Sequence, residues 1–228
     1  MDFAQGEVLL VDKPLKWTSF DVVNKIRNGL KKKYGKIKVG HAGTLDPLAT
    51  GLLIVCTGKF TKRVDEYQAQ EKEYTGTIRL GATTPTLDAE MEPDHFFPTE
   101  HITPDLVHEA IKNFIGEIEQ MPPMYSALKV GGETAYKAAR AGRELELKPR
   151  TVTIAEFELT NISLPEVGFR VVCSKGTYIR SLARDLGIAV GSGGYLTSLR
   201  RTRIGEFRVE DAWDLQKLGE KLTEETNQ

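Results

Sequence analysis

One carboxylate in a turn-rich stretch has the setting of a catalytic group. The stretch Gly40–Gly51 reads GHAGTLDPLATG, and its Asp46 stands directly before Pro47. Strand-like segments, Ile37–Val39 and Leu52–Cys56, flank it, and loops held between ordered elements carry function more often than cores do. Because a proline confines the preceding residue to an extended backbone, we expect Asp46 in a restricted conformation. The residues alone leave a second interpretation open, a surface turn in which Asp46 bonds its own backbone.

Extended to GHAGTLDPLATGLL, the same stretch resembles the catalytic signature of the TruB-type pseudouridine synthases. Further blocks resemble this family in the same order: DKPLKWTSFDVV, KEYTGTIRLG, MPPMYSALK, SKGTYIRSLARDLG and YLTSLRRTRIG. Together they cover the chain from about Leu9 to Phe207. The resemblance implies an enzyme that isomerises uridine 55 in the T-loop of tRNA. It would flip the base out of its stack, cleave the glycosidic bond, rotate the uracil and join C1′ to C5.

The resemblance assigns catalytic roles to Asp46, Arg180 and Tyr74. Asp46 would act at the ribose as nucleophile or base. A carboxylate that stays ionised where water is excluded needs a cationic partner, and Arg180 in SKGTYIR matches the family arginine for this role. Tyr74 matches the tyrosine that stacks on the uracil and helps to remove the C5 proton. Without the resemblance, Arg180 reads as a structural ion-pair residue and Tyr74 as a core aromatic.

Other matched positions concern the uridine pocket. His41, Tyr178 and Leu199 match substrate-binding positions. Asp88, in TPTLDAE, matches a second acidic position near the site, and Lys13 is expected to shape the pocket wall together with Pro14. Read without the resemblance, these residues would be surface or core residues.

Positive charge is concentrated although the net charge is −1. Seven basic residues and no acid lie between Lys25 and Lys38, and a second cluster is formed by Arg200, Arg201 and Arg203. Local basic patches suit contact with RNA phosphates. The residues predicted to contact the RNA backbone are Lys31, Lys32, Lys33, Arg200 and Arg201. The alternative is that both clusters are solvated protein surface.

Composition is that of a globular protein, with 40% hydrophobic and 28% charged residues among 228. We see no apolar run near the ~18 residues of a membrane span and no secretory signal, so a cytoplasmic location is predicted. Cys56 and Cys173 lie in apolar strand-like runs and are predicted to be core residues rather than a disulfide or metal site. The resemblance implies a monomer that uses neither metal nor cofactor.

Strands and helices alternate with short turns, which predicts an α+β fold with a mixed, mainly antiparallel sheet flanked by helices, the pseudouridine synthase fold. Strands are predicted at 7–11, 52–55, 73–80, 151–160 and 167–174, and strand-like pieces within 196–207. Helices are predicted at 20–33, 60–67, 104–114, 135–141, 178–190 and 211–222. Ser19 is the predicted N-cap of the first helix, and Thr103 with Pro104 begins the third.

We expect residues 1–228 to form a single catalytic domain. Residues 121–150, with a Pro122-Pro123 pair and a Gly131-Gly132 turn, match a thumb-like insertion that clamps the T-loop in the family and is mobile without RNA. Most relatives end in a small RNA-binding domain of the PUA type. This chain continues for about 20 residues after GEF, so we expect no PUA domain.

Two other functions compete with this interpretation. A glycoside hydrolase also begins at a glycosidic bond, but that class normally uses a pair of carboxylates, and the signature stretch has one. A non-catalytic tRNA-binding or folding helper would keep the basic patches and the insertion and would tolerate the loss of Asp46.

Overall fold

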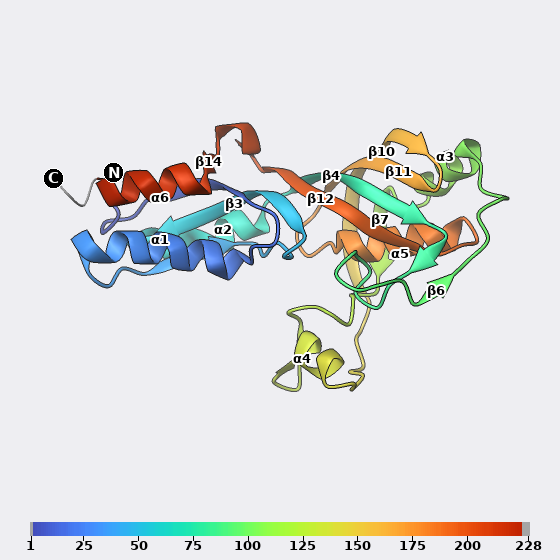
Figure 1. Cartoon of the computed structure of the whole chain (residues 1–228), viewed down its shortest axis with the longest axis horizontal. Helices are drawn as coiled ribbons and strands as arrows, with labels where there is room; N and C mark the ends of the chain where they lie inside the picture. The colour runs from blue at the N-terminus through green and yellow to red at the C-terminus, as the bar shows by residue number, and fades with distance from the viewer. Residues whose placement is uncertain (1, 225–228) are drawn as a thin grey trace. The chain divides into compact units, whose positions relative to one another are not determined.

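The computed structural model describes residues 2–224 and divides into two compact units (Figure 1). Unit 1 comprises Met1–Tyr74 and Leu199–Gln228, and unit 2 comprises Thr75–Ser198. The chain passes between them within two strands, β4 (Lys72–Leu80) and β12 (Gly194–Ile204).

Unit 1 is built on a mixed sheet. Strand β3 (Ala49–Thr57) pairs antiparallel with β1 (Val8–Lys13) and β2 (Val39–Ala42), and parallel with β12 from Leu199 to Arg201. The short strand β14 (Trp213–Asp214) lies parallel to β1, and β13 (Phe207–Arg208) lies antiparallel to the end of β12. Apolar residues fill β3, which is buried on both faces from Leu52 to Thr57. This strand therefore gives the unit a rigid centre.

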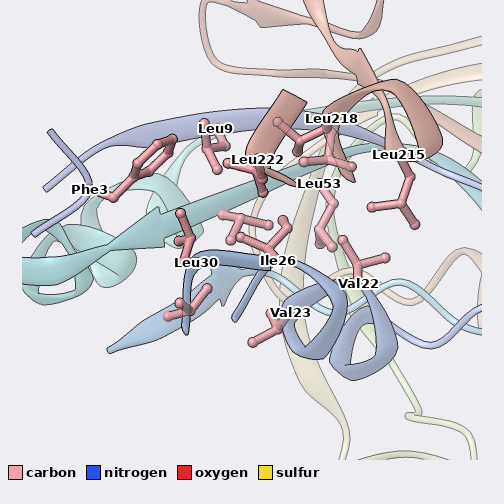
Figure 2. Packing of buried hydrophobic residues seen from close by; sticks show 13 residues of the cluster. Phe3, Leu9, Val22, Val23, Ile26, Leu30, Leu53, Leu215, Leu218 and Leu222 are labelled. Carbon is pink, nitrogen blue, oxygen red and sulfur yellow. The ribbon is translucent and has the colours of Figure 1, made fainter. Parts of the chain in front are cut away.

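Two amphipathic helices, α1 (Ser19–Tyr34) and α6 (Leu215–Glu224), pack together in unit 1. Figure 2 shows Val22, Ile26 and Leu30 of α1 facing Leu218 and Leu222 of α6, with Leu53 of β3 between them. These side chains are at most 2% exposed. Because these residues recur at the spacing of one helix face, the sequence indicates which sides of α1 and α6 pack together.

The N-cap of α1 is Thr18, not Ser19. The Thr18 hydroxyl accepts the Asp21 N–H at 3.0 Å, and the Asp21 carboxylate accepts the Thr18 N–H at 2.9 Å, which completes a capping box. The hydroxyl of Ser19 binds elsewhere, as described below. The sequence prediction was wrong by one residue because either side chain can cap a helix.

In unit 2, neighbouring strands of the sheet follow the order β4, β11 (Glu166–Cys173), β10 (Arg150–Ser163) and β7 (Gly116–Gln120). Strand β10 pairs antiparallel with both β11 and β7. Phe157 lies at the centre of the core, with the rings of Phe114 and Phe169 edge-on at centroid distances of 6.2 and 6.1 Å. The helices α3 (Pro104–Lys112) and α5 (Ile179–Ala189) pack against each other.

Residues 121–150 leave the sheet at the end of β7 and return to it at the start of β10. They contain the hairpin β8 (Lys129–Val130) with β9 (Glu133–Thr134) and the helix α4 (Ala135–Arg140), seen in Figure 1 in yellow-green. A second two-stranded piece, β5 (Ala82–Thr83) with β6 (His95–Phe96), lies in the connection between β4 and α3.

The predicted α+β class with a mixed, mainly antiparallel sheet is confirmed. Thr103 caps α3 with Pro104 in its first turn, as predicted. Strand β7 was missed, and the predicted segment 60–67 is a 3-10 helix, η1 (Gly58–Arg63), followed by α2 (Val64–Ala69). The final helix begins at Leu215 rather than at 211, after a second 3-10 turn, η2 (Val209–Asp211). Cys56 and Cys173 are buried, as expected of core residues.

No helix between residues 2 and 224 is both long and apolar enough to cross a membrane.

Candidate functional site

Asp46 lies in a loop shorter than the sequence predicted. Gly40 and His41 belong to strand β2, and β3 already begins at Ala49, so the loop covers residues 43–48. Its turn is closed by the Ala49 N–H, which donates to the Asp46 carbonyl at 3.0 Å. Asp46 is partly exposed, as a group that meets a substrate must be.

A buried hydroxyl from α1 holds the loop on one side. The Ser19 Oγ accepts the Leu45 N–H at 2.9 Å and lies 3.3 Å from the Leu45 carbonyl oxygen. Ser19 is 2% exposed and Leu45 is 3% exposed. Because Leu45 directly precedes Asp46, this pair fixes the backbone next to the carboxylate. The sequence gives no local signal for the contact, since its partners stand 26 positions apart.

Arg201, on β12, binds one residue of the loop and one residue of the strand that follows it. Its Nε donates to the Leu52 carbonyl at 2.8 Å and its Nη2 donates to the Gly43 carbonyl at 3.0 Å. The residue is only 1% exposed, so the predicted contact of Arg201 with the RNA backbone was wrong. The prediction failed because a basic cluster in a sequence does not reveal which of its members points inward.

Gly51 is required where β12 passes the loop. It has φ 102°, and a Cβ built on it would lie 2.2 Å from the Arg201 carbonyl oxygen. Both the backbone conformation and the contact exclude a side chain here. The close approach brings Arg201 beside β3 in register with Gly51.

Lys13 holds the loop from β1. Its fully buried ammonium group donates to the carbonyl oxygens of Trp17 (2.6 Å), Pro14 (3.0 Å) and Pro47 (3.4 Å). Burial lowers the pKa of Lys13 to about 8; the negative charge of Asp46 opposes this shift and the positive charge of Arg201 adds to it. Lys13 therefore tethers the residue after Asp46 and places positive charge near it.

Lys16 has φ 66°, a backbone conformation that glycine favours and other residues rarely adopt. Its N–H donates to the Pro47 carbonyl at 2.8 Å, so this turn also contacts the residue after Asp46.

His41 and Leu199 accompany the loop in unit 1. His41 is half-buried on β2, opposite Val55 of β3, and burial followed by the charge of Arg201 lowers its pKa. The imidazole is therefore neutral at pH 7. Leu199 pairs with Ala49 of β3, at the end of the loop, and is half-buried. Tyr74, on β4, is 8% exposed.

Arg180 is buried in unit 2, on the first turn of α5, at 5% exposure. Its Nη1 donates to the Thr86 carbonyl at 2.8 Å and its Nη2 to the Tyr125 carbonyl at 2.9 Å. Asp88 is nearby, with its Oδ2 3.8 Å from the Arg180 Nε. The structure thus brings together two residues that the sequence placed 92 positions apart, and it orients the guanidinium through backbone carbonyls.

Tyr178, the N-cap of α5, is half-buried in the same unit. Its backbone N–H donates to the Oε1 of Gln120 at 2.8 Å, and its carbonyl accepts from the Gln120 Nε2 at 3.1 Å. Gln120 was missed by sequence reasoning, although it directly precedes the recognised block MPPMYSALK. A buried amide at a strand end carries no distinct pattern.

The remaining basic residues differ in what they contact. Lys31 is exposed on α1. Arg200 binds the Asp12 carboxylate with both terminal nitrogens, at 2.7 and 3.0 Å, and Arg203 binds Glu71 at 2.9 Å. The side chains of Lys32 and Lys33 lie outside the part that the structure describes. In the described chain, no group of three His, Cys, Asp or Glu residues is arranged to hold a metal ion.

Comparison with known proteins gives consistent matches over the whole chain. The family model "TruB family pseudouridylate synthase (N terminal domain)" matches residues 31–179, and "tRNA pseudouridylate synthase B C-terminal domain" matches residues 180–228. Proteins named tRNA pseudouridine synthase B are 58% identical in Flavobacterium johnsoniae, over 97% of this chain and 98% of the relative, and 59% identical in Phocaeicola vulgatus, over 99% and 97%.

A solved structure titled "Crystal Structure of a Cbf5-Nop10-Gar1 Complex" contains a similar chain, with 32% identity and a TM-score of 0.73. The match covers 96% of this chain and 54% of the solved chain. This chain therefore spans about half the length of that protein.

Proposed function

Since the chain belongs to the TruB family of pseudouridylate synthases, we propose that it converts uridine 55 in the T-loop of tRNA to pseudouridine. Pseudouridine formation in tRNA is the activity of relatives that match almost the whole chain at 58–59% identity. The observation that carries the finer proposal is the Asp46 loop, which buried side chains of three different elements hold in place.

The reaction is an isomerisation. The C1′–N1 bond breaks, the uracil turns, a C1′–C5 bond forms, the proton on C5 leaves and N1 gains one. It requires no oxidant and no energy source, but it requires a carboxylate held at the ribose. Asp46 supplies this group, and the buried ammonium group of Lys13 is close enough for the charge of Asp46 to act on it. Fixing the loop before the substrate arrives lowers the entropic cost of reaching the reactive geometry.

Arg180 is the proposed cationic partner of Asp46. Its bonds to the Thr86 and Tyr125 carbonyls orient the guanidinium. Asp88, whose Oδ2 lies 3.8 Å from the Nε, forms a buried ion pair with Arg180 and supports this orientation.

Tyr74 would stack on the uracil and help to remove the C5 proton. His41 would enter the space left by the flipped nucleotide, and its neutral form suits a position among bases. Tyr178 and Leu199 would line the uridine pocket. Each of these roles follows the family motif, residue by residue.

For RNA binding we propose the segment 121–150 together with the exposed face of α1 that carries Lys31. The segment has internal structure. Arg143 binds the Glu133 carboxylate with both terminal nitrogens, and the guanidinium of Arg140 lies 4.9 Å from the ring centroid of Tyr136. We infer that this thumb-like segment clamps the T-loop and that the chain acts as one catalytic domain, as a monomer, in the cytoplasm.

The test uses purified protein and its Asp46→Asn variant with an unmodified tRNA transcript. Pseudouridine is mapped by a chemical adduct that stops reverse transcription. We expect the wild type to modify only the T-loop uridine, and the variant to bind the transcript without reacting. A wild type that binds RNA and forms no pseudouridine would favour the RNA-binding helper instead.

A further inference from the structure

The two ends of the segment 121–150 meet in the sheet of unit 2. Gln120, the last residue of β7, pairs with Arg150, the first residue of β10. Both residues contact Tyr178. The base of the insertion and the start of α5 are therefore joined through this strand pair.

Gln120 binds the main chain of Tyr178 through its side-chain amide. Its side chain is fully buried, and its amide accepts from the Tyr178 N–H at 2.8 Å and donates to the Tyr178 carbonyl at 3.1 Å. In this arrangement the primary amide makes the two hydrogen bonds that the backbone of a neighbouring strand would otherwise make. It satisfies both polar groups of one residue and fixes the plane of that residue's backbone.

Arg150 holds the side chain of the same tyrosine. Its guanidinium carbon lies 5.0 Å from the centroid of the Tyr178 ring, within the range of a cation–π contact. Gln120 thus fixes the backbone of Tyr178. Arg150, which pairs with Gln120 across β7 and β10, fixes the ring.

Tyr178 determines how α5 begins. Its carbonyl accepts the Leu182 N–H at 3.1 Å, which is a first-turn bond of the helix, and Arg180 lies within that turn. Tyrosine lacks the short oxygen-bearing side chain with which Ser, Thr, Asp or Asn cap a helix. The direction of the first turn therefore depends on the contact with Gln120.

The residues after Gln120 contact side chains of α5. The Met121 carbonyl accepts from Ser181 Oγ at 2.7 Å and from Arg184 Nη2 at 3.1 Å, and the Tyr125 carbonyl accepts from Arg180. Any shift of the Gln120 end is thus transmitted to the residues that orient Arg180.

We propose that Gln120 is a positioning residue for pseudouridine formation, which sets the places of Tyr178 and Arg180, and that Arg150 sets the ring of Tyr178. The proposal rests on the roles given to Tyr178 and Arg180 in the proposed function. Gln120 itself is buried and acts through its neighbours rather than on the substrate.

The test compares Gln120→Met, which keeps the side-chain length and loses both hydrogen bonds, with Gln120→Glu, which keeps the acceptor for the Tyr178 N–H. Single-turnover rates at saturating enzyme and RNA dissociation constants are measured on a T-stem-loop transcript. We expect Gln120→Met to lower the rate about 10- to 100-fold, since a displacement of about 1 Å can cost roughly 100-fold. Gln120→Glu should fall between it and the wild type, with RNA affinity retained in both variants.

Arg150→Met is the second variant, because Arg150 is partly exposed and its loss leaves the core intact. We expect a smaller loss of rate from it. Glu117→Gln, exposed on the same strand β7, is the matched control and should have the wild-type rate. Circular dichroism melting checks that each protein is folded.

The outcomes separate the two proposals. A wild type that forms no pseudouridine would contradict the proposed function. If the wild type is active and a folded Gln120→Met protein has the same rate, the positioning role is overturned. The same holds if Gln120→Met loses RNA affinity by the same factor as it loses rate. If Gln120→Met does not fold, wild-type rates in both Gln120→Glu and Arg150→Met would overturn it.

Discussion

Replacing Arg201 by methionine tests whether the loop that carries Asp46 depends on this buried side chain. The change removes the donors to the Leu52 and Gly43 carbonyls. The Leu52 carbonyl is buried and Gly43 is only partly buried. An unsatisfied buried carbonyl costs about 1–3 kcal/mol, so the free energy of unfolding should fall by at least about this amount. For a chain of this size, a loss of 2 kcal/mol corresponds to a melting temperature lower by about 4–8 °C.

Activity should fall together with stability. Gly43 lies in the loop and Leu52 in the strand that follows it, so without Arg201 the loop is held less firmly, and under the proposed function Asp46 would no longer be fixed at the ribose. A displacement of about 1 Å is enough for a loss of roughly 100-fold in the single-turnover rate. Arg201→Lys keeps the charge, but a single ammonium group cannot span both carbonyls, and it should recover only part of the rate and stability.

The assay is urea unfolding followed by circular dichroism, combined with single-turnover pseudouridine formation. Arg208→Met, an exposed arginine on β13 in the same unit, is the matched control. An Arg201→Met protein whose free energy of unfolding lies within about 0.5 kcal/mol of the wild type, with an unchanged rate, would refute the reasoning.

Burial lowers the pKa of Lys13 to about 8 from 10.5, so between these values the unfolded chain binds a proton that the folded chain lacks. The free energy of unfolding of the wild type should therefore rise with pH in this window relative to Lys13→Met, as measured by urea unfolding at each pH. Arg180→Lys should fold normally and lose most turnover, because a point charge does not reproduce the fork that binds the Thr86 and Tyr125 carbonyls. Tyr74→Phe keeps the ring, so RNA affinity should be retained while turnover falls through loss of the hydroxyl. Lys31→Ala should weaken RNA binding and reduce the slope of log affinity against log salt by about one, as measured by titrations at several salt concentrations.

Each of these results has a contrary outcome. Parallel pH dependence of the wild type and Lys13→Met would show that the ammonium group is not desolvated. Wild-type turnover in a well-folded Arg180→Lys protein would show that the two donor groups of the guanidinium are not required. Full turnover in Tyr74→Phe would exclude the hydroxyl from proton transfer, and an unchanged salt slope for Lys31→Ala would place that lysine away from phosphates.

Local features of the fold were largely predictable. Strand β3, helix α1 and the Thr103–Pro104 start of α3 follow from apolar periodicity and capping chemistry, which act between residues close in sequence. Strand β7 (GEIEQ) was missed because it is short and has one apolar residue, Ile118, between two exposed glutamates, and only its pairing with β10 makes it a strand.

The candidate site, like the fold, has features that the sequence predicted and features that it did not. The ordered motifs identify the family and the residue types of the reaction, since Asp46, Tyr74 and Arg180 stand within continuous matched blocks. The contacts that hold those blocks were not readable. Ser19 looks like a cap and instead binds Leu45, and Arg201 looks like a phosphate ligand and instead lies buried against Gly43.

The sequence by itself thus determined the family and the fold class and supplied the residues proposed to react, because these depend on residue identity and short-range order. Only the tertiary structure decided which cations are buried, which hydroxyl holds the loop and which amide fixes Tyr178. The reason is physical. Hydrogen bonds between residues far apart in the chain depend on how the strands and helices pack, and no short-range pattern records that packing.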